Sequence, residues 1–164
     1  MPVNIAPLLF ACAPLVHPVT AQALLAVESE FNPYAIGVVG GVLERQPTTL
    51  RQAIATARAL RVGGWDFSVG LAQINVRNWE RMGLSAETVF DPCVNLRAMQ
   101  RILQQCYARA TIQAPQQARL RAALSCYYAG DFAADWRDGY VQRVVAATRT
   151  QAAGSASLRS GRPN

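Results

Sequence analysis

The sequence contains no lysine, a single histidine and few charged side chains, and these shortages exclude several classes of protein. Charged residues make up 16% of the 164 residues and hydrophobic residues 51%, a balance that excludes a largely disordered chain. No apolar run approaches the roughly 20 residues that a membrane-spanning helix needs. His17 has no second histidine with which to form a metal site or a proton relay. We therefore expect a compact, soluble, one-domain protein that uses no metal and no cofactor.

All 16 basic residues are arginines, and the net charge is +6. Such a balance favours anionic surroundings, among them nucleic acid, anionic lipid and acidic cell-wall polymer. The arginines are scattered from Arg45 to Arg162 without a run of five or more, which argues against a nucleic-acid-binding stripe. We expect no nucleic-acid partner and no membrane span.

The four cysteines show no CxxC spacing, so zinc-binding and redox motifs are disfavoured. The remaining choices are disulfides in an oxidising compartment and buried thiols in a reducing one. Cys12 lies two residues before Pro14 and Cys93 directly follows Pro92, each near a predicted helix start, and such positions suit a cross-link that closes a long loop. Cys106 and Cys126 fall on the apolar stripes of two later helices, where packed thiols are the favoured interpretation.

The N-terminal stretch MPVNIAPLLFACAPLVHPV is apolar, but it does not have the pattern of a secretory signal. No basic residue precedes the apolar part, and prolines interrupt it, whereas a signal has a positive leader and an unbroken hydrophobic core. We expect this stretch to be a first structural segment.

Helical periodicity and capping residues predict a mostly α-helical fold. The residues after about Arg149 are small, polar and uncapped, so we predict one domain over residues 1–149 and a disordered tail over 150–164. Short extended segments are expected as a β-hairpin around Gly40–Gly41 and over 65–76. The expected helices are 18–30, 49–62, 92–110, 116–129 and one around 139–148.

Glu28 breaks the apolar pattern of the helix predicted over 18–30. Projected at about 100° per residue, Glu28 falls among the apolar side chains of LLAVESEF, while Glu30 points away. A carboxyl group held there is partly dehydrated, which raises its pKa and keeps a proton available for general acid catalysis. The competing interpretation is a helix-end glutamate whose stem covers apolar surface while its head reaches water.

A set of amide and aromatic side chains has the chemistry of a carbohydrate site, because sugar rings combine apolar faces with polar edges. Each of these residues alone is more often a core residue than a ligand contact. The set comprises Gln73, Asn75, Trp65, Trp79, Trp136, Tyr127 and Tyr128.

Several blocks, taken in order, carry a specific resemblance: AVESEFNPYA, SVGLAQINVRNW, FDPCVNLRAMQRIL, ALSCYYAGD and GYVQRVV. They resemble the lysozyme-like lytic transglycosylases, and most closely the group attached to type IV secretion systems, over roughly residues 12–147. The resemblance implies a mainly α, α+β lysozyme-like fold: a single helical domain with a small β-hairpin insert and a glycan-binding cleft. It also implies a periplasmic location.

The resemblance assigns roles to residues in the first two blocks. Glu28 matches the single catalytic acid, and Ser29 matches the residue that helps to orient its carboxylate. Gly70, Gln73 and Asn75 match the block that lines the sugar cleft.

The later blocks supply a tyrosine and the cysteine pair. Tyr127 matches a tyrosine that faces the catalytic glutamate, and Cys12 and Cys93 match the family's two cysteines, which supports a bridge between them. Two residues depart from the family pattern. Tyr128 replaces an asparagine involved in substrate positioning, and Ala72 replaces a common methionine in a cleft wall.

The resemblance implies a peptidoglycan lytic transglycosylase that cleaves the β-1,4 bond between N-acetylmuramic acid and N-acetylglucosamine and leaves a 1,6-anhydro end. Its partners would be glycan strands and other type IV secretion components, for which it would open the wall locally. One alternative is a non-catalytic peptidoglycan-binding or assembly subunit of the secretion apparatus, in which Tyr128 has lowered turnover. A hydrolysing lysozyme is the other.

Overall fold

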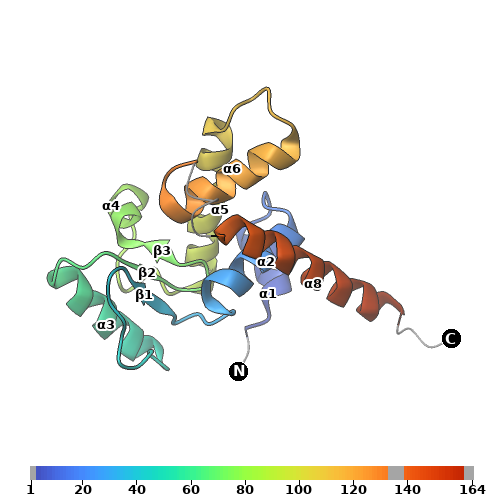
Figure 1. Ribbon diagram of the computed structural model, residues 1–164. Coiled ribbons are helices and arrows are strands. Elements are labelled where there is room, and N and C mark those ends of the chain that lie inside the picture. Colours follow the sequence, from blue (N-terminus) through green and yellow to red (C-terminus); the bar gives the residue numbers. More distant parts are fainter. Residues whose placement is uncertain (1–2, 133–138, 161–164) are drawn as a thin grey trace. The chain divides into compact units, whose positions relative to one another are not determined.

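The computed structural model describes residues 3–132 and 139–160. Helices predominate, and a small antiparallel sheet accompanies them, which confirms the predicted mainly α fold (Figure 1). In this part of the chain, no helix is both long enough and apolar enough to cross a membrane. The elements are α1 (Ile5–Cys12), α2 (Pro18–Ser29), β1 (Ile36–Val38), α3 (Leu50–Val62), β2 (Phe67–Val69), β3 (Ile74–Asn75), η1 (Val76–Asn78), α4 (Trp79–Met82), α5 (Pro92–Arg109), α6 (Gln116–Ala129) and α8 (Tyr140–Ser160).

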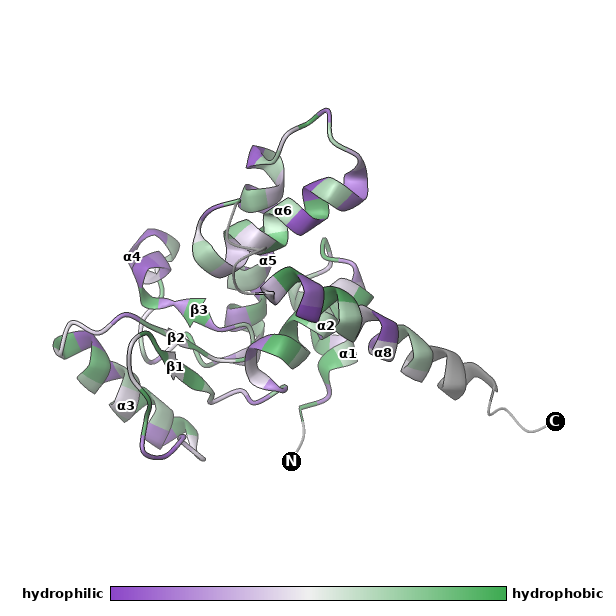
Figure 2. Cartoon of the chain, in the orientation of Figure 1, coloured by the Kyte–Doolittle hydropathy of each residue, from purple (hydrophilic) through white to green (hydrophobic). Residues whose placement is uncertain are grey.

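Helices α3 and α6 have typical capping residues. At the start of α3, the Thr49 side chain accepts a hydrogen bond from the Gln52 backbone N–H at 3.2 Å, and Gly63 follows its end. Gly130, with φ +79°, follows α6 in the left-handed conformation that ends many helices. Figure 2 shows hydrophobic beside hydrophilic residues along α3, the amphipathic pattern from which that helix was predicted.

The chain divides into two compact units. Unit 1 comprises residues 1–14 and 28–99 and contains the sheet, whereas unit 2 comprises residues 15–27 and 100–164 and is helical. Helices α2 and α5 contribute residues to both units.

The sheet of unit 1 has the order β1-β2-β3, and both pairings are antiparallel. Its strands alternate as a half-buried sheet requires. One face packs into the core, where Phe67 is fully buried and its ring meets Trp79 edge to face at 5.6 Å. The other face carries Gly37, Ser68 and Asn75, which are opposite one another in the register and reach solvent.

The predicted β-hairpin around Gly40–Gly41 is wrong. Strand β1 pairs with β2, and the Val39 N–H extends this pairing by donating to the Asp66 carbonyl at 2.9 Å. The outer edge of β1 is covered by a side chain: Gln46 accepts from the Ile36 N–H at 2.9 Å and donates to its carbonyl at 2.8 Å. Because Gln46 satisfies these edge groups, β1 needs no second hairpin strand.

Two disulfides link the cysteines, so none is free. The predicted Cys12–Cys93 bridge is confirmed, with Cα atoms 5.2 Å apart in unit 1. The interpretation of Cys106 and Cys126 as packed thiols is wrong. They form a second bridge, with Cα atoms 5.7 Å apart in unit 2, because the apolar stripes of α5 and α6 bring them together.

Helix α8 continues past residue 149 to Ser160, so helical backbone stands where the sequence analysis expected disorder. The segment from Gln151 onward is rich in alanine, which has the highest helix propensity. The domain boundary at residue 149 stays a prediction, and residues 161–164 lie outside the described part.

Candidate active site

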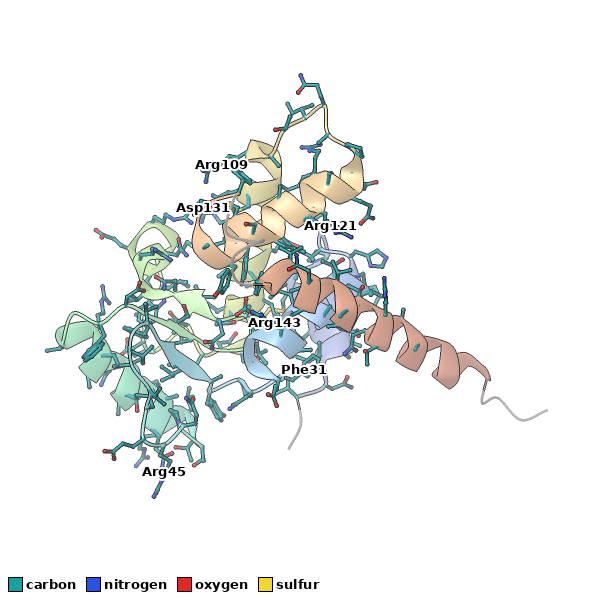
Figure 3. All side chains as sticks on the ribbon, viewed as in Figure 1. Phe31, Arg45, Arg109, Arg121, Asp131 and Arg143 are labelled. Carbon is teal, nitrogen blue, oxygen red and sulfur yellow. A yellow bond between two sulfur atoms is a disulfide. The ribbon has the colours of Figure 1, made fainter. Side chains whose placement is uncertain are left out.

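Glu28 lies on the last turn of α2, where it is partly buried. The two leucines of the preceding turn, Leu24 and Leu25, are completely buried, while Glu30 is exposed. This placement matches the helical projection. Beyond Ser29 the backbone leaves the helix abruptly, because Glu30 and Phe31 have φ values of +52° and +63° (Figure 3).

The residue after Glu28 is anchored to a loop far along the chain. The Ser29 hydroxyl donates a hydrogen bond of 2.7 Å to the carbonyl oxygen of Leu71. Leu71 lies in the loop 70–73, between β2 and β3, which carries predicted sugar-binding residues. The end of α2 that holds Glu28 is therefore tied directly to the predicted sugar-binding loop.

Gln73 closes that loop with its side chain. Its amide nitrogen Nε2 donates to the carbonyls of Ala35 and Gly70, both at 3.0 Å. Both amide hydrogens are thus used, while the oxygen Oε1 accepts no hydrogen bond within the described part of the chain. This oxygen lies beside Gly37, where an added Cβ would come within 2.9 Å of it. The Gln73 side chain therefore keeps one acceptor and no donor, and its predicted contact with sugar stays a prediction.

Asn95, which the sequence analysis did not select, fixes the same loop from behind. It is fully buried on α5. Its Oδ1 accepts from the Ala72 N–H at 2.8 Å, and its Nδ2 donates to the carbonyls of Val69 and Val89 at 3.1 and 2.9 Å. The available signal was a polar residue on the apolar stripe of α5, the same kind of anomaly that singled out Glu28.

Gly70 is required at its position for two reasons. Its φ of +81° is a conformation that favours glycine, and an added Cβ would lie 2.3 Å from the Asn95 nitrogen. These contacts account for the glycine without any contact to sugar.

Asn75 makes contacts mainly within the protein. Its Nδ2 donates to Asp66 Oδ1 at 2.7 Å and to Ser68 Oγ at 3.2 Å, and its Oδ1 accepts from the Arg77 N–H at 3.0 Å. The Asn75 side chain thus caps η1 and orders the solvent-facing side of the sheet. Its predicted contact with sugar stays a prediction.

Tyr127 and Tyr128 lie on the last turn of α6 in unit 2. Tyr127 is partly buried. The ring of Tyr128, 41% exposed, stacks on Tyr140 with centroids 4.4 Å apart and planes 10° from parallel. Glu28 belongs to unit 1, so the pairing of Tyr127 with Glu28 stays a prediction.

No other cluster in the described residues offers a competing reaction centre. Within them, no group of three or more histidine, cysteine, aspartate or glutamate side chains could hold a metal ion. A cavity of about 770 Å³ in unit 2, bordered by His17, Tyr107 and Leu120, contains none of the predicted site residues.

Residues 10–144 match a family model described as "Transglycosylase SLT domain". The type IV secretion system protein virB1 of Brucella suis biovar 1 (strain 1330) is 51% identical over 142 residues, which is 82% of this chain and 60% of that protein. Protein virB1 of Agrobacterium fabrum (strain C58 / ATCC 33970) is 34% identical over 140 residues, 84% of this chain and 56% of that protein. The chain thus spans 56–60% of the length of these two relatives. No solved structure gives a match.

Proposed function

From the premise that this chain belongs to the transglycosylase SLT domain family, we propose that it is a peptidoglycan lytic transglycosylase. It cleaves the β-1,4 bond between N-acetylmuramic acid and N-acetylglucosamine and leaves a 1,6-anhydro-N-acetylmuramic end. The observation that carries the proposal is the partly buried residue Glu28, next to a serine that is hydrogen-bonded to the loop 70–73. A carboxyl group on a partly buried residue held by rigid elements suits a general acid.

The reaction needs one carboxyl group. Glu28 donates its proton to the glycosidic oxygen, so the bond to the anomeric carbon breaks while the acetamido group of the substrate assists at that carbon. The resulting carboxylate then takes the proton of the 6-hydroxyl, whose oxygen bonds to the anomeric carbon and closes the anhydro ring. No water is consumed, and Glu28 regains its proton.

A second acid would be expected in an ordinary glycosidase, which uses two carboxyl groups. Besides Glu28, the matching sequence blocks contain Glu30, Asp91 and Asp131, while Asp66 and Glu80 lie close beside a block, and all five are exposed. Asp66 is hydrogen-bonded to Asn75, and Asp91 accepts from the Val94 N–H at 2.9 Å as a cap of α5. These contacts give both aspartates structural roles, which supports a mechanism with a single acid.

Mass analysis of the products from purified peptidoglycan tests the proposal. We expect anhydro-ended muropeptides from the natural chain and a loss of at least about 100-fold in Glu28→Gln, the scale of a lost general acid. Glu30→Gln is the matched control, because its carboxyl lies two residues away and is exposed. Equal rates in the Glu28 variant and the natural chain would refute the assignment, and reducing ends would identify a hydrolysing lysozyme.

The second candidate function is a non-catalytic peptidoglycan-binding or assembly subunit. The observation in its favour is Tyr128, which stands in place of the family's asparagine and stacks on Tyr140. Binding to the wall without formation of new anhydro ends would favour this candidate.

The relatives support a proposal for the cellular context of this activity. Proteins named as type IV secretion components are 51% identical to this chain, so we propose that it opens the wall locally for such an apparatus, in the periplasm. The two disulfides support this location, because they form and persist in oxidising compartments.

A further inference from the structure

Asn95 is a fully buried polar side chain whose hydrogen bonds hold the loop of the candidate site. It is 0% exposed, both of its amide hydrogens are donated, and its oxygen accepts a backbone N–H. A buried amide satisfied in this way holds its partners firmly, because losing it would leave backbone groups without partners away from water.

Asn95 holds the loop on both sides of Gly70 and Leu71, because it bonds to the Val69 carbonyl and to the Ala72 N–H. The Leu71 carbonyl, in the same peptide group as that N–H, accepts the hydrogen bond of the Ser29 hydroxyl. A continuous set of hydrogen bonds therefore runs from α5 through this loop to the residue next to Glu28. All of these residues belong to unit 1.

The third bond of Asn95 secures the helix that carries it. Its Nδ2 also donates to the Val89 carbonyl, just before α5 begins. The adjoining turn is closed by the Asn95 N–H, which donates to the Asp91 carbonyl at 2.9 Å. Asn95 thus connects the loop to the first turn of α5, which is itself held by hydrogen bonds.

We propose that Asn95 is a positioning residue of the reaction: it sets the loop 70–73, and through Leu71 and Ser29 it sets the direction of the Glu28 carboxyl. This inference rests on the proposed function. Without Asn95, the Leu71 carbonyl loses its fixed place, so the Ser29 hydroxyl turns and the surroundings of the acid change. Misplacement of a reacting group by about 1 Å can lower a rate about 100-fold.

The test compares Asn95→Ala with Met99→Ala. Met99 lies one turn further along α5, is fully buried in the same unit and has an apolar side chain, so its loss destabilises unit 1 without removing any hydrogen bond that holds the loop. We expect both variants to lower Tm. Only Asn95→Ala should lower kcat, by about 10- to 100-fold with KM nearly unchanged, and shift the pH dependence of kcat.

Asn95→Asp keeps an acceptor for the Ala72 N–H, and its buried carboxyl, protonated beside two carbonyls, restores one of the two donated bonds, so its kcat should lie between those of the natural chain and Asn95→Ala. It also replaces Asn95→Ala if that variant fails to fold. A kcat and pH profile equal to those of Met99→Ala would overturn the proposal.

Amide hydrogen exchange separates the two proposals. In the first outcome, the natural chain is inactive and its Ala72 amide exchanges faster in Asn95→Ala but not in Met99→Ala; this would refute the proposed function and leave the positioning of the loop intact. In the second outcome, the natural chain is active, but Asn95→Ala changes neither kcat, nor the pH profile, nor the exchange rate; this would refute the positioning role alone.

Discussion

The two units of this chain divide charge and hydrogen bonding unequally. Unit 1 carries seven arginines and seven acidic residues, whereas unit 2 carries nine arginines and three acidic residues, so the entire net charge of +6 falls in unit 2. Unit 1 in turn holds the loop 70–73 and the fully buried Asn95, with bonds from amides and a hydroxyl to backbone groups.

In the proposed function, this difference separates two tasks. Unit 1 would supply the acid on a loop-anchored helix end, since each side chain that holds the loop is itself hydrogen-bonded. Unit 2 supplies positive charge on its helices, with Arg109, Arg121 and Arg143 extending from α5, α6 and α8 (Figure 3). A positive surface attracts an anionic polymer over distances that hydrogen bonds do not reach.

The largest effect on stability should come from the two disulfides. In the chain-entropy model, losing the Cys12–Cys93 bridge, with a sequence separation of 81, costs about 4.5 kcal/mol. Losing Cys106–Cys126, with a separation of 20, costs about 3.3 kcal/mol. Urea unfolding of the two paired cysteine-to-serine variants measures both values, and a reversed order would show that loop length does not govern their contribution.

Gly70→Ala should have the next largest effect, about 3 kcal/mol, because it adds a Cβ clash with Asn95 to the cost of a positive φ. Gly40→Ala is the matched control. Its φ is +71° with no atom within 4 Å of the added Cβ, so we expect only about 1–2 kcal/mol. Equal losses in denaturant unfolding would mean that the contact with Asn95 does not constrain the loop.

Removing charge should affect binding to the wall more in unit 2 than in unit 1. Arg121→Gln combined with Arg149→Gln should weaken binding to purified peptidoglycan by about tenfold or less at low salt. Arg45→Gln combined with Arg51→Gln, exposed residues of unit 1, should weaken it less. The difference should vanish near 1 M salt, where the Debye length is about 3 Å, and its persistence there would exclude an electrostatic origin.

The ion pair between Arg58 and Glu87 should have the smallest effect, because both side chains are largely exposed. A hydrogen bond from Ser85, the Glu87 backbone N–H and a hydrogen bond from Arg58 hold the pKa of Glu87 below its ordinary value of 4.5. The pair's contribution is therefore present above the unfolded pKa and is lost as pH falls through the lowered one. We expect Arg58→Ala to lower Tm only slightly more than Arg51→Ala at pH 7, and this small difference to disappear as the pH falls below about 4.

Local patterns were sufficient to predict α2, α3, α5 and α6 and the position of Glu28 near the end of α2, whereas α1 was not predicted and α8 extends past its predicted end. Residues such as Thr49, Gly63 and Gly130 end or begin helices through contacts a few residues away, so their effect is visible in sequence. Glu28 was visible because it interrupts a helical stripe.

Features that depend on distant partners were missed. Gln46 covers the edge of β1, and Cys106 on α5 forms a disulfide with Cys126 on α6. No local sequence pattern predicts either contact. Asn95, like Glu28, is a polar residue on the apolar stripe of a helix. Its structural role depends on three backbone groups that become its neighbours only after folding.

Gln73 gives the candidate site a chemical preference that its amide type alone would not suggest. With both hydrogens held by the carbonyls of Ala35 and Gly70, its free oxygen is what a strand bound in the proposed site would meet. A sugar hydroxyl or acetamido N–H can satisfy that oxygen, but a hydroxyl masked by esterification would set oxygen against oxygen. Stretches of wall modified in this way would be passed over, and cutting would concentrate on unmodified strands.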